Sequence, residues 1–433
     1  MKIFRSFSIY VVASVLSAAI NFLLLPYLSN RLTPADYGMV AIFNTYVSIL
    51  APLMSLLCYS YLNVQYYKTK DRSALVRAVS SVHAIPFLFF LGYLLVVFLF
   101  YRPLTAAMEV PDGSVPWLLL VPVFGLIVNY NEIFNSLLII EKRAALFGGI
   151  TVARVLLEAV LTICLISVFD LGWEGRLFAW LAATVLLMLF GFVHLLRRGL
   201  LKPVWDASFV RASLAFGLPL LLHTIGKFII NQSDRLFLTK MISISEMGIY
   251  NVGYQIGSIV LIFCTAFNNS FVPFLYERLS HLTEKGKKEI ARISLFFILA
   301  LALVVAALIL LSPWFFRTFL DARYYRGWRY VSWIGLAYWF WGIYLVFSGY
   351  LFYYKRTRFL TFLAVFNVVV NIGLNYLLIG RYGAIGAAYA TALSFFLVTV
   401  IVVAAASRIH PFRFADALRS GNPTGEVTDG HRQ

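Results

Sequence analysis

Residues 293–311 read ISLFFILALALVVAALILL, a stretch without a charged side chain. An α-helix rises 1.5 Å per residue, so about 20 such residues cross the roughly 30 Å hydrocarbon core of a bilayer. Similar runs recur along the whole chain of 433 residues, of which 61% are hydrophobic and 13% are charged. A soluble domain carries roughly 25% charged residues. The sequence therefore predicts an all-α integral membrane protein.

Twelve apolar runs are long enough to span the membrane. They cover residues 7–29, 37–62, 81–101, 115–140, 147–169, 173–195, 212–233, 248–275, 291–315, 328–353, 359–379 and 383–407. The first run is too long, and the second follows it too closely, for a cleaved signal peptide. Residues 408–433 are expected to form a polar tail, and no stretch remains for a sizeable soluble domain.

The basic residues are distributed unevenly between the two sides of these spans. Of the 36 Lys and Arg residues, 24 lie in the two terminal segments or in the loops and span ends on their side, and ten lie in the loops and span ends on the opposite side. The other two, Arg154 and Lys227, lie deep within spans. The positive-inside rule then predicts that both termini are cytoplasmic. Since the basic residues orient the chain and meet anionic lipid headgroups, the net charge of +17 does not indicate a nucleic-acid partner. Cys58, Cys164 and Cys264 show no CxxC spacing, so neither a metal site nor a cofactor is expected.

The two halves of the chain resemble each other. LTPADYGMVAIFN (32–44) matches ISISEMGIYNVGY (242–254) with a shift of 210, which pairs Gly38 with Gly248. LGWEGRLFAWLA (171–182) matches YGAIGAAYATAL (382–393) with a shift of 211. These matches predict a parallel repeat of two six-helix lobes, 1–200 and 201–407, around a central cavity. Transporters built from repeats bind their substrate where the repeats meet.

Several polar side chains lie within the predicted spans. In HTIGKFIINQSDRLFL (223–238), the side chains of His223, Lys227, Asn231 and Asp234 fall on one face at 100° per residue. Lys227 is expected about 20 Å from the cytoplasmic end of its span. Asp234 and Arg235 mark the external end, where the arginine is expected to extend to the interface. Such a stripe should face protein or water, not lipid.

The fifth span carries Arg154 and Glu158, which are four residues apart and can form an ion pair. With a shift of 213, these positions correspond to Asn367 and Asn371 in the second half. The remaining candidate polar residues of the cavity are Glu132, Asn251 and Gln255. Each charge in mid-membrane costs about 2.5–3.5 kcal/mol, a cost that a water-filled cavity largely removes. The alternative is that these polar residues have a structural role. In that case Arg154 and Glu158 neutralise each other as an ion pair, and the asparagines form interhelical hydrogen bonds.

Arginine and lysine in a cavity indicate an anionic cargo. In addition, LTPADYG (32–38), DRLFLTKMISISEMGIYNVGYQI (234–256) and GAIGAAYATALS (383–394) resemble the polysaccharide (O-antigen, Wzx-type) flippases of the MOP exporter superfamily. The resemblance covers about residues 1–405 and includes the Asp-Arg pair at 234–235.

The resemblance implies a flippase of the bacterial cytoplasmic (inner) membrane, not an enzyme. Its cargo would be an undecaprenyl-diphosphate-linked oligosaccharide, moved to the outer leaflet by alternating access for surface polysaccharide biosynthesis. The candidate substrate-binding cations are Arg154, Lys227 and Arg235. The candidates for coupling a proton or sodium ion include Glu158, Glu132 and Asp234. Other glycan-assembly membrane proteins are possible partners.

Two alternatives stay open at this stage. One is a multidrug or small-molecule exporter of the same superfamily, whose cavity should be dominated by carboxylates. The other is a membrane glycan polymerase or glycosyltransferase, which usually needs a long external loop or acidic residues in the first external loop. Here the first external loop, about residues 30–36, contains Asp36 as its one carboxylate.

Overall fold

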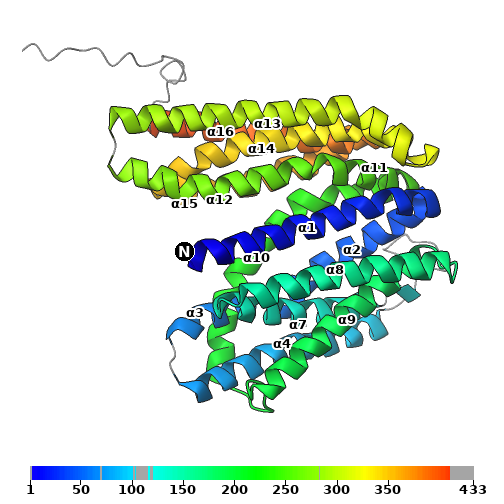
Figure 1. Ribbon diagram of the computed structural model, residues 1–433, viewed down its shortest axis with the longest axis vertical. Coiled ribbons are helices and arrows are strands. Elements are labelled where there is room, and N and C mark those ends of the chain that lie inside the picture. The colour runs from blue at the N-terminus through cyan, green and yellow to red at the C-terminus, as the bar shows by residue number, and fades with distance from the viewer. Residues whose placement is uncertain are drawn as a thin grey trace, which may run out of the picture. The chain divides into compact units, whose positions relative to one another are not determined.

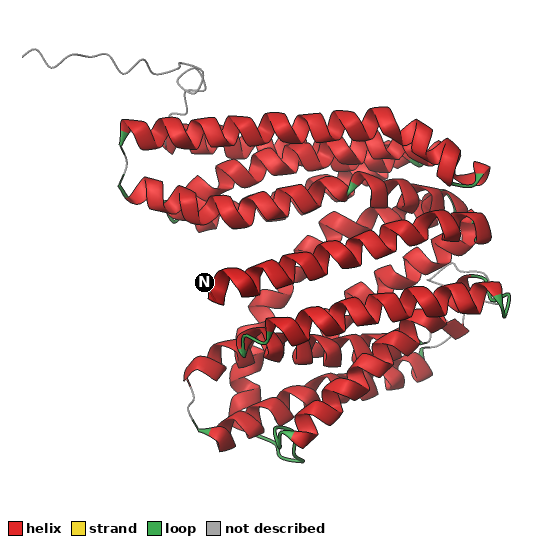
Figure 2. Cartoon of the chain, viewed as in Figure 1, coloured by secondary structure: helices red, strands yellow, loops and turns green. Residues whose placement is uncertain are grey.

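The structure is a computed structural model that describes residues 2–68, 71–100, 103, 116–117, 120–281 and 283–409, without the side chains of 2–8, 222, 223 and 227. Within these residues the chain folds into helices joined by short connections, and no strand is present (Figure 2). The predicted all-α membrane fold is confirmed. The expected loop at 102–114, apart from residue 103, and the expected tail beyond residue 409 lie outside the described residues.

The helices follow the predicted spans closely (Figure 1). They are α1 (Lys2–Arg31), α2 (Pro34–Ser55), α3 (Cys58–Lys68), α4 (Arg72–Leu99), α7 (Val121–Ile140), α8 (Ala144–Ser167), α9 (Trp173–Arg197), α10 (Ala207–Met241), α11 (Ile244–Gly257), α12 (Ile259–Ser280), α13 (Glu284–Phe319), the 3-10 helix η2 (Ala322–Gly327), α14 (Trp328–Tyr353), α15 (Thr357–Tyr382) and α16 (Ile385–Ile409). In this described part of the chain, 12 helical segments are long and apolar enough to cross a membrane, one for each predicted run.

Two of the spans are broken, which the apolar pattern did not predict. Helix α2 ends at Ser55, and the next two residues, Leu56 and Leu57, have φ angles of 45° and 53°, in the left-handed region that non-glycine residues rarely adopt. Gly217 of α10 packs against this break, since a Cβ there would lie 2.0 Å from the Leu56 carbonyl oxygen. In the eighth span, Ser258 separates α11 from α12. The break in α2 thus requires a residue without a side chain on the neighbouring helix.

The chain packs into two compact units. The first comprises Met1–Ile256, Ser312–Tyr330 and Val368–Ala390, and within it α1 runs beside α8 (Figure 1). The second comprises Gly257–Leu311, Val331–Asn367 and Thr391–Gln433. There the rings of Phe267 and Phe297 stack with centroids 3.6 Å apart, and the Trp339 indole donates to the Ile298 carbonyl over 3.0 Å. The predicted lobes, 1–200 and 201–407, divide the chain into two continuous segments and differ from these units. The lobes therefore stay a prediction.

The two repeat-related motifs build the same local structure. Thr33 caps α2: its hydroxyl accepts the Asp36 amide over 3.1 Å, and the Asp36 carboxylate accepts the Thr33 amide over 2.9 Å. At the start of α11, the Ser243 hydroxyl accepts the Glu246 amide over 3.1 Å. Threonine and serine thus begin these helices at positions 210 residues apart, because each satisfies an amide that has no partner within its helix.

The paired glycines of the repeat lie at the contact between these two helices. A Cβ on Gly38 would lie 2.1 Å from the Ile244 carbonyl oxygen, and a Cβ on Gly248 would lie 1.9 Å from the Pro34 carbonyl oxygen. Any side chain would collide with backbone on the opposite helix. The first turns of α2 and α11 therefore approach each other through their main chains.

We expect Asp206→Ala to lower the free energy of unfolding by about 1 kcal/mol, because Asp206 caps α10. Its carboxylate accepts the Ser208 hydroxyl over 2.6 Å and the Phe209 amide over 2.9 Å, and these hydrogen bonds lower the pKa of Asp206. A lowered pKa in the folded state means that the stabilisation is present at neutral pH and disappears as the pH falls through the carboxyl range.

Thermal unfolding in detergent at neutral and acidic pH measures this effect. Asp206→Asn is the control, since asparagine also caps helices and should retain most of the stability at neutral pH. An alanine variant as stable as the wild type at neutral pH would contradict the assigned role of the cap.

Candidate functional site

Three charged side chains from α8 and α9 form one cluster within the spans. The Glu158 carboxylate lies between two guanidinium groups: Nη1 of Arg154 is 2.9 Å from Oε2, and Nη2 of Arg176 is 2.9 Å from Oε1. We call Arg154, Glu158 and Arg176 the α8–α9 charge cluster. The side chains of Arg154, Arg176 and Glu158 are 28%, 16% and 10% exposed, respectively. The carboxylate is therefore enclosed, while both arginines remain accessible.

The local sequence explains this geometry. Arg154 and Glu158 are one turn apart on α8, as their spacing predicted. Residues 168–172 turn the chain directly into α9, which brings Arg176 back to the end of α8. There Nη1 of Arg176 donates to the Thr162 hydroxyl over 2.9 Å, and that hydroxyl donates to the Glu158 carbonyl over 2.6 Å. Arg154 lies ten residues into its helix, or about 15 Å from the helix start.

Arg176 is not among the residues predicted from the sequence, because the apolar pattern places it at the end of its span. The sequence does contain a pattern that indicates Arg176: Glu158 and Thr162 occupy one face of a predicted helix, just before a short connection. A basic residue soon after such a connection lies within reach of that face.

Polar residues from α7, α2 and α11 lie around the cluster. Glu132 of α7 is exposed, and the charge of Arg154 acts on its carboxylate. Tyr37 of α2 is buried; the charge of Arg176 acts on its hydroxyl, which also shares a hydrogen bond with the exposed Gln255 of α11. Glu158 is thus the carboxylate in direct contact with both arginines.

The predicted Asp-Arg pair forms a separate, buried network. The residues Asp234 and Arg235 are 3% and 6% exposed. Arg235 donates to the Asn231 carbonyl over 2.9 Å and to the Asn251 side-chain oxygen over 3.3 Å, and its guanidinium lies over the Tyr254 ring at 4.4 Å. The Tyr250 hydroxyl donates to Asp234. The expectation that Arg235 extends to the membrane interface is wrong, because these partners hold it inside the protein.

The remaining candidate residues fall into three groups. Asn371 of α15 is 1% exposed and accepts hydrogen bonds from Ser233 of α10 over 3.1 Å and from Asn375 of its own helix over 3.0 Å. The first of these is an interhelical hydrogen bond, as the structural alternative expects. Asn367 is also buried, whereas Asn231 is exposed. His223 and Lys227 belong to α10, but their side chains lie outside the described part of the structure.

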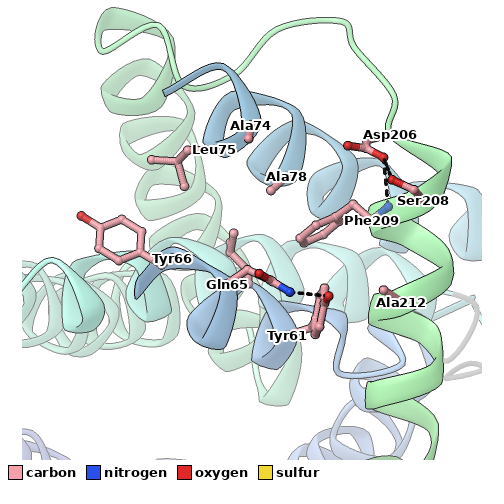
Figure 3. A pocket seen from close by; sticks show the side chains of 11 residues that line it. Tyr61, Gln65, Tyr66, Ala74, Leu75, Ala78, Asp206, Ser208, Phe209 and Ala212 are labelled. Carbon is pink, nitrogen blue, oxygen red and sulfur yellow. Dashed lines mark hydrogen bonds between the residues drawn. The ribbon is translucent and has the colours of Figure 1, made fainter. Parts of the chain in front are cut away.

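A pocket of about 200 Å³ opens between α3, α4 and the start of α10 (Figure 3). Tyr61, Gln65 and Tyr66 line it from α3, and Phe209 faces them from α10. Its charged lining residue is Asp206, whose Oδ1 atom accepts the cap hydrogen bonds of α10 and whose Oδ2 atom lies 3.7 Å from Nε of Arg77. Since no cation lines it, this pocket does not suit an anionic group.

Metal binding has no candidate in the described residues, where no group of three or more His, Cys, Asp or Glu side chains could hold an ion. Cys58 and Cys264 are buried and Cys164 is exposed, all as free thiols. Arginine side chains such as those of the α8–α9 charge cluster are able to bind oxyanions through charge-assisted, bidentate hydrogen bonds.

Comparison with known proteins adds the family. Residues 3–279, more than half of the chain, match the model described as polysaccharide biosynthesis protein. The chain belongs to this polysaccharide biosynthesis protein family. Residues 219–377 also match the MatE model. The family assignment confirms the resemblance to flippases of the MOP superfamily.

Two family relatives from Haemophilus influenzae are each 25% identical to this chain. One is an Lsg locus protein, aligned over 391 residues that cover 86% of this chain and 90% of the relative. The other, a membrane protein, is aligned over 384 residues that cover 86% and 89%. The similarity extends over nearly the full length of both proteins.

Among solved structures, the lipid II flippase MurJ in an inward closed conformation is similar with a TM-score of 0.73. It shares 15% identity over 94% of this chain and 88% of that chain. An inward-facing multidrug resistance MATE transporter of the MOP superfamily gives a TM-score of 0.70, with 14% identity over 92% and 94%. At such low identity these similarities establish the fold of this family member and nothing about its cargo.

Proposed function

We propose that this multi-pass flippase-type transporter moves an undecaprenyl-diphosphate-linked oligosaccharide from the cytoplasmic to the outer leaflet of the bacterial inner membrane, by alternating access. The observation that carries the proposal is the pair of accessible guanidinium groups, Arg154 and Arg176, held within the spans by Glu158. A diphosphate offers oxygens in the geometry that arginine binds best. Membership in the polysaccharide biosynthesis family supports a glycan as the rest of the cargo.

In this mechanism the diphosphate docks on Arg154 and Arg176. Lys227 of α10, 20 residues or about 30 Å from the start of its helix, is retained from the sequence as a third candidate cation. The sugars occupy a polar cavity between the lobes, while the polyprenyl tail stays in lipid. Of the three carboxylates considered for coupling to a proton or sodium ion, Glu158 and Asp234 are held by arginines, so Glu132 remains the candidate.

The buried Arg235 has a different role in this proposal. Its contacts to Asn251 and Tyr254 connect α10 with α11. We assign it to positioning these helices and not to direct contact with the diphosphate.

The second candidate function is export of drugs or other small molecules, which the MATE-like fold favours. A cation exporter requires carboxylates that are free to receive a cation. In the α8–α9 charge cluster, Glu158 already receives two arginines at 2.9 Å. The membrane enzyme is not favoured, because the family and the structural neighbours are transporters and flippases.

Binding to purified protein in nanodiscs separates these functions. We expect saturable binding of undecaprenyl-diphosphate-linked sugar and none of cationic dyes such as ethidium. Binding of the dyes alone would favour the exporter instead. In a deletion strain, the glycan on the lipid-linked intermediate that accumulates would identify the cargo.

A further inference from the structure

The α8–α9 charge cluster contains its own anion. Glu158 occupies the space between the two guanidinium groups that a bound oxyanion would occupy, with both of its oxygens engaged at 2.9 Å. Both arginines therefore have a carboxylate partner within the protein itself. Any diphosphate that docks on Arg154 and Arg176 must compete with this carboxylate.

We propose that Glu158 is a resident counter-anion which the diphosphate displaces on binding and which re-pairs with the arginines on release. This inference rests on the proposed function and concerns the same site. The cluster is suited to such an exchange, because Arg154 and Arg176 are more exposed than the carboxylate between them. The incoming anion can therefore reach the guanidinium groups from their accessible sides.

The exchange has two consequences for transport. In the empty protein, Glu158 compensates the cost of two arginines within the hydrocarbon zone, so the protein can change conformation without cargo. In the loaded protein, the displaced carboxylate competes for the arginines and weakens the hold on the diphosphate. A transporter needs such weakened binding, because cargo that binds too tightly in one conformation is not released in the other.

The contacts of Arg176 show how the site can tolerate the loss of its carboxylate partner. Its Nη1 atom donates to the Thr162 hydroxyl at 2.9 Å, separately from the Nη2 contact with Glu158. Thr162 thus keeps the guanidinium oriented when the carboxylate moves away.

The test is anion binding to Glu158→Gln, in which the amide keeps the shape of the side chain but removes its charge. Purified protein in nanodiscs is titrated with undecaprenyl diphosphate, undecaprenyl monophosphate and, separately, inorganic pyrophosphate. We expect the variant to bind the diphosphate lipid about tenfold tighter than the wild type, a typical size for coupling between competing ligands, and to export less glycan. Pyrophosphate should show the same gain, and the monophosphate a smaller one.

The chain offers a matched control in Glu141, at the end of α7. Its Oε2 atom also lies between two arginines, 3.0 Å from Nε of Arg143 and 2.7 Å from Nη1 of Arg198, but outside the spans. Glu141→Gln adds the same charge to the protein and should leave diphosphate binding unchanged. Equal gains in both variants would mean that net charge alone attracts the lipid, and would overturn the inference.

Other outcomes separate this inference from the proposed function. Wild-type affinity in Glu158→Gln would overturn the exchange while leaving the flippase in place. No diphosphate binding to the wild type or to any variant would overturn both. Should Glu158→Gln fail to fold, Glu158→Asp serves instead: it keeps the charge but is too short to bridge both arginines, so tighter binding than in the wild type is again expected.

Discussion

Replacing Arg154 and Arg176 together with glutamine should abolish export of the surface glycan. Each guanidinium contributes a charge-assisted contact of about 1.5–3 kcal/mol, so the loss of both should weaken diphosphate binding by about 100-fold or more. The two substitutions also leave Glu158 without its ion-pair partners, as an uncompensated carboxylate in the spans. Its repulsion of the diphosphate adds to the effect. Surface glycan is measured by immunoblotting of cells that carry the variant.

The control is a double variant with Arg143→Gln and Arg198→Gln, the two arginines around Glu141, which removes the same number of positive charges from the protein. This control should export at close to the wild-type level, and all variants should be present in the membrane in equal amounts. Normal export by the Arg154 and Arg176 double variant would remove the α8–α9 charge cluster from the mechanism.

Gly248→Ala should stop transport by a different mechanism, because the added methyl group should push α2 and α11 apart. The new methyl group would lie 1.9 Å from the Pro34 carbonyl oxygen and 2.8 Å from the Gly38 amide nitrogen. These are backbone atoms, which cannot rotate away as a side chain can. Overpacking of this kind costs about 1–3 kcal/mol and should disfavour the conformation in which these helix starts touch.

The readout is labelling by a membrane-impermeant thiol reagent at Gln255→Cys, an exposed position two turns from Gly248 on α11. We expect faster labelling from the predicted external side in Gly248→Ala, together with loss of glycan export. Gly149→Ala and Gly373→Ala are the controls, because a Cβ at either helical position meets no atom within 4 Å. Unchanged labelling and export in Gly248→Ala would contradict the role assigned to this contact.

The sequence predicted the spans well because their length and composition are imposed by the bilayer, independently of how the helices pack. The Arg154–Glu158 pair could be predicted for a similar reason, since residues four apart on a helix must be neighbours. These features depend on local geometry alone.

The features that depend on neighbouring helices were missed or wrong. Arg176 reaches Glu158 only because α9 folds back on α8, and its place in the chain suggested an external charge. Arg235 was expected at the interface, whereas Tyr254 and Asn251 of α11 keep it buried. The break at Leu56 is stabilised by a contact with Gly217, more than 150 residues away in the sequence. Such partners cannot be identified from one sequence by periodicity.

The contact between Gly38 and Gly248 also bears on the origin of the chain. Residues at equivalent positions of two matching segments touch each other here, which is how identical subunits meet at a two-fold axis. A protein of half this length, with a single such glycine, could form the same contact by pairing with a second copy of itself. At this contact the chain therefore resembles a homodimer whose two subunits have been fused.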